Sequence, residues 1–154
     1  VGRGLAEQAA RGQAPPLVEP ADLARHTLIE GDNAQPSSAC RSWRSWLREQ
    51  NLAQLEPQRE LVLNYDYQKV QAALSGQGVV LARLPLVAES LERGELVEPF
   101  GAACRLASPF AYWLIEFKNG QPARPEVMLF AHWLVTQSEQ TRRVTDLAVN
   151  AVPA

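Results

Sequence analysis

The chain has 154 residues, of which 46% are hydrophobic and 21% are charged, and its formal net charge at pH 7 is −2. These values are typical of a globular protein that is large enough for one core. They give no general electrostatic reason to bind nucleic acid or a membrane surface. No apolar run approaches the roughly 20 residues that span a bilayer, so we expect no membrane partner.

The N-terminus and the cysteines indicate the compartment. Residues 1–12 lack an initiator Met and the apolar core of a signal peptide, so we expect a processed chain or a piece of a longer one. Cys40 and Cys104 stand far apart and in no CxxC spacing. This favours two reduced thiols in a cytoplasmic protein over a disulfide. His26 and His132 have no second ligand at i+3 or i+4, so we expect no metal and no cofactor.

The first part of the chain alternates short helical and extended segments. Residues 5–11 predict an amphipathic helix that Gly12 closes, and residues 20–25 predict a single helical turn with Pro at its start. Residues 26–29 predict a short strand because they include Thr, Leu and Ile. A polar loop, residues 30–38, then leads into a helical segment over residues 38–51.

Two tryptophans characterise that helical segment. Trp43, Trp46 and Leu47 lie on one helical face, and three arginines lie on others. Aromatic residues interleaved with basic ones can stack on single-stranded nucleic acid. Packing of both indoles against a sheet is the interpretation we favour, because each carries a large apolar area.

The central stretch, residues 61–83, predicts a βαβ unit. Residues 61–63 form an apolar run, and Asp66 is placed to cap a helix that begins at Tyr67. Gly76 and Gly78 end that helix, and residues 79–82 are a second β-forming run. Short links between strand, helix and strand favour two parallel strands joined by a right-handed crossover.

The remainder continues the alternation. The expected elements are a helix at 86–93, a brief strand at Leu96 and Val97, a loop at 101–108, a strand at 110–117, a turn at 118–120, a helix from Pro125 to about Arg142 with an apolar face, and a loose tail at 148–154. The pattern as a whole predicts an α/β fold.

No catalytic constellation is visible. The chain has no GxSxG elbow, no glycine-rich phosphate loop and no histidine beside an obvious nucleophile. The GxG at residues 76–78 follows a helix and not a strand, so it predicts a cap and not a dinucleotide site. We therefore expect that the protein is not an enzyme.

A series of short motifs occurs along the chain in an order typical of one protein family. Its members are PL at residues 16–17 with DLARHTLI at 22–29, WRSWL at 43–47, DY at 66–67, GQGV at 76–79, LAR at 81–83, LERGELVEPF at 91–100, AYWL at 111–114, and PEV at 125–127 with Phe130 and WL at 133–134. In this order, over about residues 15–136, the chain resembles LysR-type transcriptional regulators. It is most similar to the branch that includes regulators of glycine cleavage and of β-lactamase induction.

The resemblance implies an effector-binding domain with the type II periplasmic-binding-protein fold. In that family two α/β subdomains flank a cleft for a small-molecule effector, and the effector alters how a dimer or tetramer holds DNA. Residues 1–147 would be a partial domain, mainly the second subdomain, with the return strand at 110–117 and the last helix of the first. DNA would be bound only through a winged helix-turn-helix that these residues lack.

The candidate effector site follows from the geometry of parallel sheets, whose ligands bind beyond the carboxyl ends of the strands. Asn64, Tyr65, Asp66 and Tyr67 follow the first strand of the βαβ unit. An anionic effector would suit the positive end of the helix that begins there. Asp66 has two readings, a structural cap or a ligand contact, and the cap is favoured.

Arg83 follows the second parallel strand and is the best placed cation for an effector carboxylate. The favoured reading is nevertheless a surface arginine that pairs with a neighbour such as Glu89. Ser37 and Ser38, just before the tryptophan segment, are candidates for hydrogen bonds to the effector, although N-capping is favoured.

Two other functions remain open. An oligomerisation or interaction domain without ligand binding would use exposed apolar surface, such as the long helix from Pro125 or the strand edges. A free-standing solute-binding protein would need a signal peptide and a complete second subdomain, and neither is visible.

Overall fold

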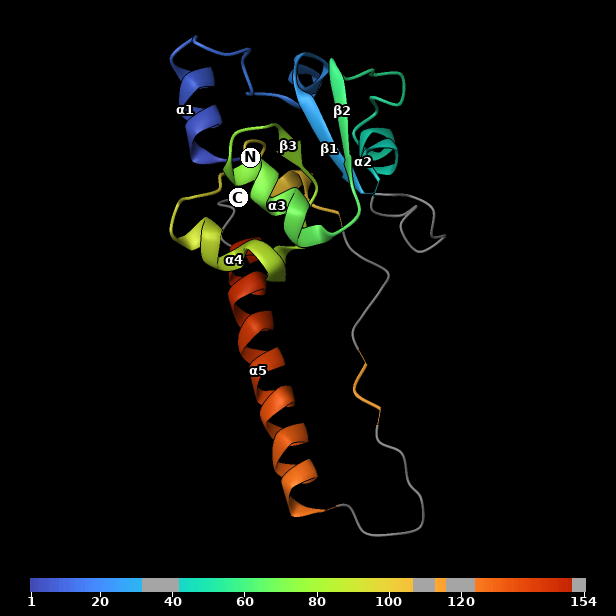
Figure 1. Ribbon diagram of the computed structural model, residues 1–154, viewed down its shortest axis with the longest axis vertical. Helices are drawn as coiled ribbons and strands as arrows, with labels where there is room; N and C mark the ends of the chain where they lie inside the picture. The colour runs from blue at the N-terminus through green and yellow to red at the C-terminus, as the bar shows by residue number, and fades with distance from the viewer. Residues whose placement is uncertain (32–41, 107–112, 116–123, 151–154) are drawn as a thin grey trace. The chain divides into compact units, whose positions relative to one another are not determined.

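The protein is described by a computed structural model that covers residues 1–31, 42–106, 113–115 and 124–150, with side chains up to residue 143 (Figure 1). The chain divides into two units, Val1–Leu106 and Ala107–Ala154. The helices and strands are α1 (Arg3–Ala10), β1 (Thr27–Gly31), α2 (Trp43–Glu49), β2 (Arg59–Leu63), α3 (Asp66–Leu74), β3 (Val79–Val80), α4 (Leu84–Glu92) and α5 (Pro125–Asn150), with 3-10 helices at Pro20–Arg25 and Ala102–Cys104.

A three-stranded parallel sheet in the order β2-β1-β3 organises the first unit. The β1–β2 register runs from Thr27 opposite Arg59 to Gly31 opposite Leu63. The predicted βαβ unit is confirmed, since β2 and β3 lie parallel in one sheet, with β1 between them. The second strand is shorter than predicted, because only Val79 and Val80 pair with β1 and residues 81–82 do not.

One core lies on the α2 face of the sheet. Leu28 of β1 packs there with Trp43, Trp46 and Leu47 of α2, which are all at most 6% exposed. The Nε1–H of Trp43 donates to the carbonyl of Ile29 at 3.1 Å. Packing of both tryptophans against the sheet is therefore confirmed, and burial leaves no open indole face for stacking bases.

A second core lies on the α3 face. Ile29, the next residue along β1, packs with Ala72 and Ala73 of α3 and with Val87 of α4. The alternation follows from the two-residue period of a strand. It places α2 and α3 against opposite faces of the sheet.

Gly76 ends α3 in the way that the sequence predicts. Its φ is +75°. Its N–H bonds the carbonyl of Ala73, and the N–H of Gln77 bonds that of Ala72. These two bonds define a Schellman cap, which favours glycine at this left-handed position.

The segment before β1 is held by a buried carboxylate. The predicted helical turn at Pro20–Arg25 is confirmed as a 3-10 helix. One oxygen of Asp22 accepts from the backbone N–H groups of Val18 and Glu19 at 2.9 and 3.1 Å, and the other accepts from Arg25 at 2.8 Å. These bonds, first among them the one from Val18, hold the pKa of Asp22 below its ordinary value although burial opposes them.

Three expected elements differ in the structure. The brief strand at Leu96 and Val97 is an isolated antiparallel bridge from Leu96 to Gly2. The expected loop at 101–108 contains the 3-10 helix Ala102–Cys104. Of the strand expected at 110–117 only residues 113–115 are described, and they have no strand structure. Their side chains are exposed, as fits an unpaired segment.

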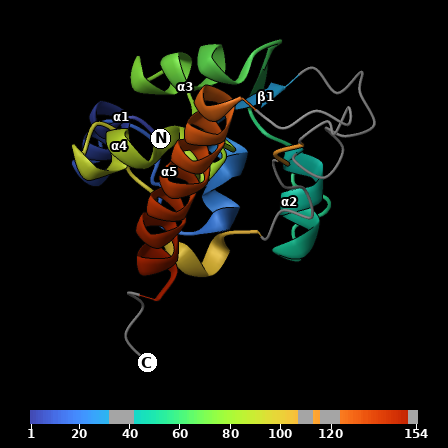
Figure 2. The ribbon, with the colours of Figure 1, turned by 90° about the horizontal axis from the view of Figure 1, so that it is seen from below.

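The second unit is described mainly by α5, a continuous helix in Figures 1 and 2. It begins at Pro125 as predicted and reaches Asn150, so it includes three residues of the expected tail. Within the described residues, no helix combines the length and apolar character needed to cross a bilayer.

Candidate functional site

The candidate residues lie at the carboxyl edge of the sheet. The helix that follows β1, α2, packs on one face of the sheet, and the helix that follows β2, α3, packs on the other. Ligands of open parallel sheets bind beyond the carboxyl ends of the strands. Asn64 to Tyr67 follow β2 at this edge, and Arg83 follows β3.

Three charged side chains meet there. The carboxylate of Asp66 accepts from Lys69 Nζ at 2.7 Å through Oδ1 and from Arg83 at 2.8 Å through Oδ2. The side chain of Lys69 is 14% exposed, whereas those of Asp66 and Arg83 are 37% and 34% exposed. The cluster is therefore partly open to solvent. We call Asp66, Lys69 and Arg83 the edge cluster.

The end of β1 leaves space for the lysine. A Cβ atom at Gly31 would lie 3.2 Å from Lys69 Nζ, so the ammonium group passes close over the last residue of β1. Glycine at this position allows that approach. Lys69 thus brings the first turn of α3 close to the end of β1, the strand next to β2.

Asp66 is ionised at neutral pH. Desolvation alone would raise its pKa, but the hydrogen bonds and charges of Lys69 and Arg83 outweigh it and hold the pKa below its ordinary value. The edge cluster therefore combines two cations and a carboxylate at pH 7.

The predicted capping role of Asp66 is wrong. The N-cap of α3 is Tyr65, with no side-chain hydrogen bond, and Asp66 is the first helical residue. Its carboxylate turns to the two cations instead of to the N–H groups of its own helix. Arg83 forms an ion pair, as one of its two predicted roles requires, but its partner is Asp66, whereas Glu89 pairs with Arg93.

The other predicted residues divide into two groups. Asn64, Tyr65 and Tyr67 are exposed beside the first turn of α3, and the two tyrosine rings stack with centroids 5.9 Å apart. Ser37 and Ser38 lie outside the described residues. The capping role suggested for them belongs to Ser42, whose Oγ accepts from the N–H of Ser45 at 3.2 Å.

The sequence reasoning missed Lys69. Its signal was present, because residues three apart on a helix face each other and Asp66 precedes Lys69 by three. The strand carrying Gly31 could not be placed beside it from spacing alone.

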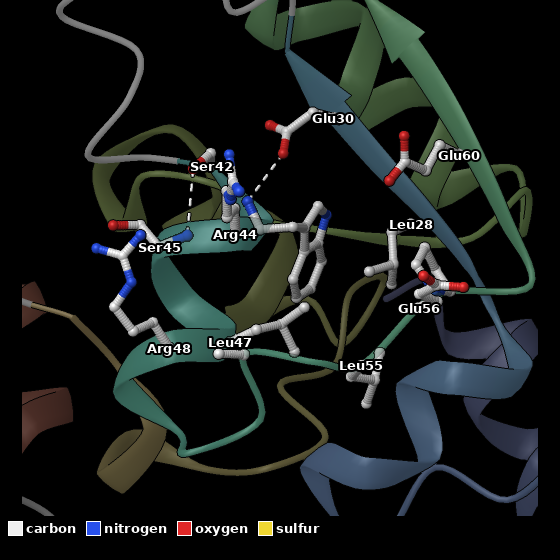
Figure 3. Close-up of a pocket in the computed structure, with 13 residues that line it drawn as sticks. Leu28, Glu30, Ser42, Arg44, Ser45, Leu47, Arg48, Leu55, Glu56 and Glu60 are labelled. Atoms are coloured by element: carbon white, nitrogen blue, oxygen red, sulfur yellow. Dashed lines mark hydrogen bonds between the residues drawn. The ribbon is translucent and has the colours of Figure 1, made fainter.

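A pocket of about 800 Å³ lies on the α2 face of the sheet (Figure 3). It is lined by Leu28, Glu30, Ser42, Trp43, Arg44, Ser45, Leu47, Arg48, Ala53, Leu55, Glu56, Pro57 and Glu60. Glu30 bridges its upper edge, because its two oxygens accept from the N–H groups of Gly31 and Trp43 at 2.9 and 2.8 Å. The start of α2 is thus already bound by the carboxylate of Glu30.

Metal ligands and thiols are further candidate functional groups in the part of the chain that the structure describes. Those residues contain no group of three His, Cys, Asp or Glu side chains that could hold a metal ion. Cys104 has a free thiol, and Cys40 lies outside the described residues.

Comparison with known proteins gives the family. The family described as LysR substrate binding domain matches residues 6–139. A glycine cleavage system transcriptional activator from Escherichia coli (strain K12) is 29% identical over 123 residues, covering 80% of this chain and 37% of that protein. The HTH-type transcriptional activator AmpR from Providencia stuartii is 33% identical over 126 residues, covering 80% and 39%. The HTH-type transcriptional regulator BlaA from Proteus vulgaris is 25% identical over 125 residues, covering 81% and 39%.

The chain spans less than two fifths of the length of these curated relatives. No solved structure matches it significantly. The family match nevertheless extends over most of the chain and agrees with the motif order in the sequence. The chain therefore belongs to the LysR substrate binding domain family, the effector-binding domains of LysR-type transcriptional regulators.

Proposed function

We propose that this chain binds a small anionic effector at the carboxyl edge of its sheet and thereby modulates DNA binding and transcription by a LysR-type regulator. The observation that carries the proposal is the convergence of Lys69 and Arg83 on Asp66 at the carboxyl edge of the sheet. An effector carboxylate would meet the planar, two-pronged guanidinium of Arg83 and the ammonium group of Lys69.

The surroundings suit the rest of a small ligand. Asn64, Tyr65 and Tyr67 are exposed at the same turn and offer an amide, two hydroxyls and two ring faces. Ser37 and Ser38 follow β1 in the chain, so they remain candidates for hydrogen bonds to the effector.

The wider architecture is part of the proposal. We assign the chain a type II periplasmic-binding-protein-like fold, mainly the second subdomain, with residues 110–117 and the last helix belonging to the first. On this view residues 1–147 are part of a domain in a cytoplasmic regulator. DNA is then bound by a winged helix-turn-helix outside these residues, because their net charge of −2 offers no attraction for phosphate.

The test is thermal melting of the chain against a panel of small carboxylates and amino acids at fixed ionic strength. A ligand at about 100 times its dissociation constant stabilises the folded form by about 2.7 kcal/mol. We expect a carboxylate to raise the melting temperature, and we expect Lys69→Met and Arg83→Met to reduce that rise.

Arg93→Met is the matched control. Arg93 is also paired with a glutamate, but it lies at the C-terminal end of α4 and not in the edge cluster. It should keep the full ligand response. If no ligand shifts the melting temperature, or if all three variants respond alike, the proposed effector site is refuted.

A second function, self-association, is favoured by the surface of α5. Met128, Leu129, Phe130 and Trp133 are 61%, 70%, 59% and 53% exposed, and the rings of Phe130 and Trp133 stack with centroids 5.9 Å apart. Exposed apolar surface of this kind favours association into a dimer or tetramer. Sedimentation of Phe130→Ser against wild type tests it. We expect the variant to shift toward monomer. A wild type that is already monomeric, or a variant that sediments like wild type, contradicts self-association through this surface.

A further inference from the structure

Asp66 occupies an unusual place for an anion-binding site. Its two carboxylate oxygens are each bonded to one of the cations that would attract the effector, at 2.7 and 2.8 Å. Any ligand group that approaches Lys69 and Arg83 must therefore approach an ionised carboxylate as well. The side chain of Asp66 is 37% exposed, so it is accessible to a ligand from solvent.

We infer that Asp66 is the specificity-determining residue of this site and selects effectors that carry one negative charge over those that carry two. The inference rests on the proposed function. Two cations and one carboxylate leave the edge cluster with one net positive formal charge. A single ligand carboxylate brings these groups to neutrality, whereas a second is repelled by Asp66 without a matching cation among them.

The partial burial of the cluster makes this repulsion effective. Charges a few ångströms apart interact more strongly near a protein surface than in bulk water, because the local dielectric constant is lower. Lys69 is only 14% exposed, which indicates that solvent screens this site incompletely.

The experiment compares two four-carbon probes, butyrate with one carboxylate and succinate with two. Calorimetric or NMR titration at pH 7 and constant ionic strength gives both affinities for wild type and for Asp66→Asn, which keeps the shape of the side chain and removes its charge. We expect wild type to prefer butyrate. We expect the variant to shift the succinate-to-butyrate affinity ratio about tenfold toward succinate, equivalent to about 1.4 kcal/mol.

Glu98→Gln is the matched control. It removes the same charge from another ion-paired carboxylate, which is bonded to Arg105 at 2.6 and 2.7 Å. The affinity ratio of this variant should equal that of wild type. An equal shift of the affinity ratio in both variants would mean that the ratio depends only on the net charge of the protein, which would overturn the inference.

The outcomes also separate this inference from the proposed function. If butyrate binds but Asp66→Asn leaves the ratio unchanged, the selectivity role of Asp66 is wrong and the effector site stands. If neither probe binds wild type or variant, the effector site fails and the inference fails with it.

Discussion

Replacing Trp46 with phenylalanine tests the core that supports the sheet. The indole is 5% exposed and donates its Nε1–H to the carbonyl of Cys104 at 2.8 Å. It also meets Trp43 edge-on, with centroids 5.5 Å apart, and Phe100 at 6.0 Å. Phenylalanine removes the donor and part of the ring. The unsatisfied carbonyl costs about 1–3 kcal/mol, and the lost apolar burial adds about 1 kcal/mol. We expect the free energy of unfolding to fall by about 2–4 kcal/mol.

Urea unfolding followed by far-ultraviolet circular dichroism measures this change without depending on tryptophan fluorescence. Trp113→Phe is the control, because that side chain is 83% exposed. It should change the free energy of unfolding by at most about 0.5 kcal/mol. Equal effects of the two substitutions, or a fall below about 0.5 kcal/mol for Trp46→Phe, would refute the assignment of this indole to the core.

Two further substitutions, Gly78→Ala and Asp22→Asn, test the contact of Gly78 with β1 and the turn before β1, with Gly4→Ala as the control for the first. Gly78→Ala would drive its Cβ into the backbone carbonyl of Thr27, so we expect a loss of about 1–3 kcal/mol in urea unfolding. Gly4→Ala, with open space around it on α1, should instead be neutral or stabilising by up to about 1 kcal/mol. Asp22→Asn should destabilise the protein by about 0.5–2 kcal/mol at pH 7. Because the folded-state pKa of Asp22 is lowered, its contribution is complete above the unfolded pKa of about 3.9 and is lost as pH falls through the folded pKa. The difference in free energy of unfolding between wild type and Asp22→Asn, measured with urea, should therefore shrink below about pH 4. A difference that stays constant with pH contradicts this role of Asp22.

The sequence predicts the fold wherever the signal is local. The apolar run of β2, the glycine that ends α3 and the proline that opens α5 each locate an element boundary within about two residues of the structure. The strand at Val79–Val80 was overestimated because β propensity continues through residues 81–82, whereas only Val79 and Val80 pair with β1, although β1 itself extends to Gly31. Pairing partners are distant in sequence, and propensity contains no information about them.

The site was predicted in part for the same reason. Strand ends locate Asp66 and Arg83, and the structure joins them across 17 residues. Which charge each one meets could not be read from spacing. The capping position of Asp66 and the neighbouring position of Glu89 suggested other partners, whereas the structure pairs Asp66 with both Lys69, three residues further on, and Arg83. A buried or half-buried charge gains more from a close opposite charge than from a cap exposed to water.

The two cores support different features: one lies beneath the helices that carry the edge cluster, and the other stabilises the opposite face of the sheet. Lys69 extends from α3, and Arg83 lies directly before α4. Both helices pack into the core formed around Ile29, where Ala73 is fully buried and Val87 is 6% exposed. The α2 core holds Trp43 and Trp46 and none of the edge cluster. A change in side-chain volume beneath α3 therefore alters the spacing of the two cations, because packed interiors transmit small displacements. A change beneath α2 acts chiefly on the stability of the sheet, so the geometry of the edge cluster depends on one core more than on the other.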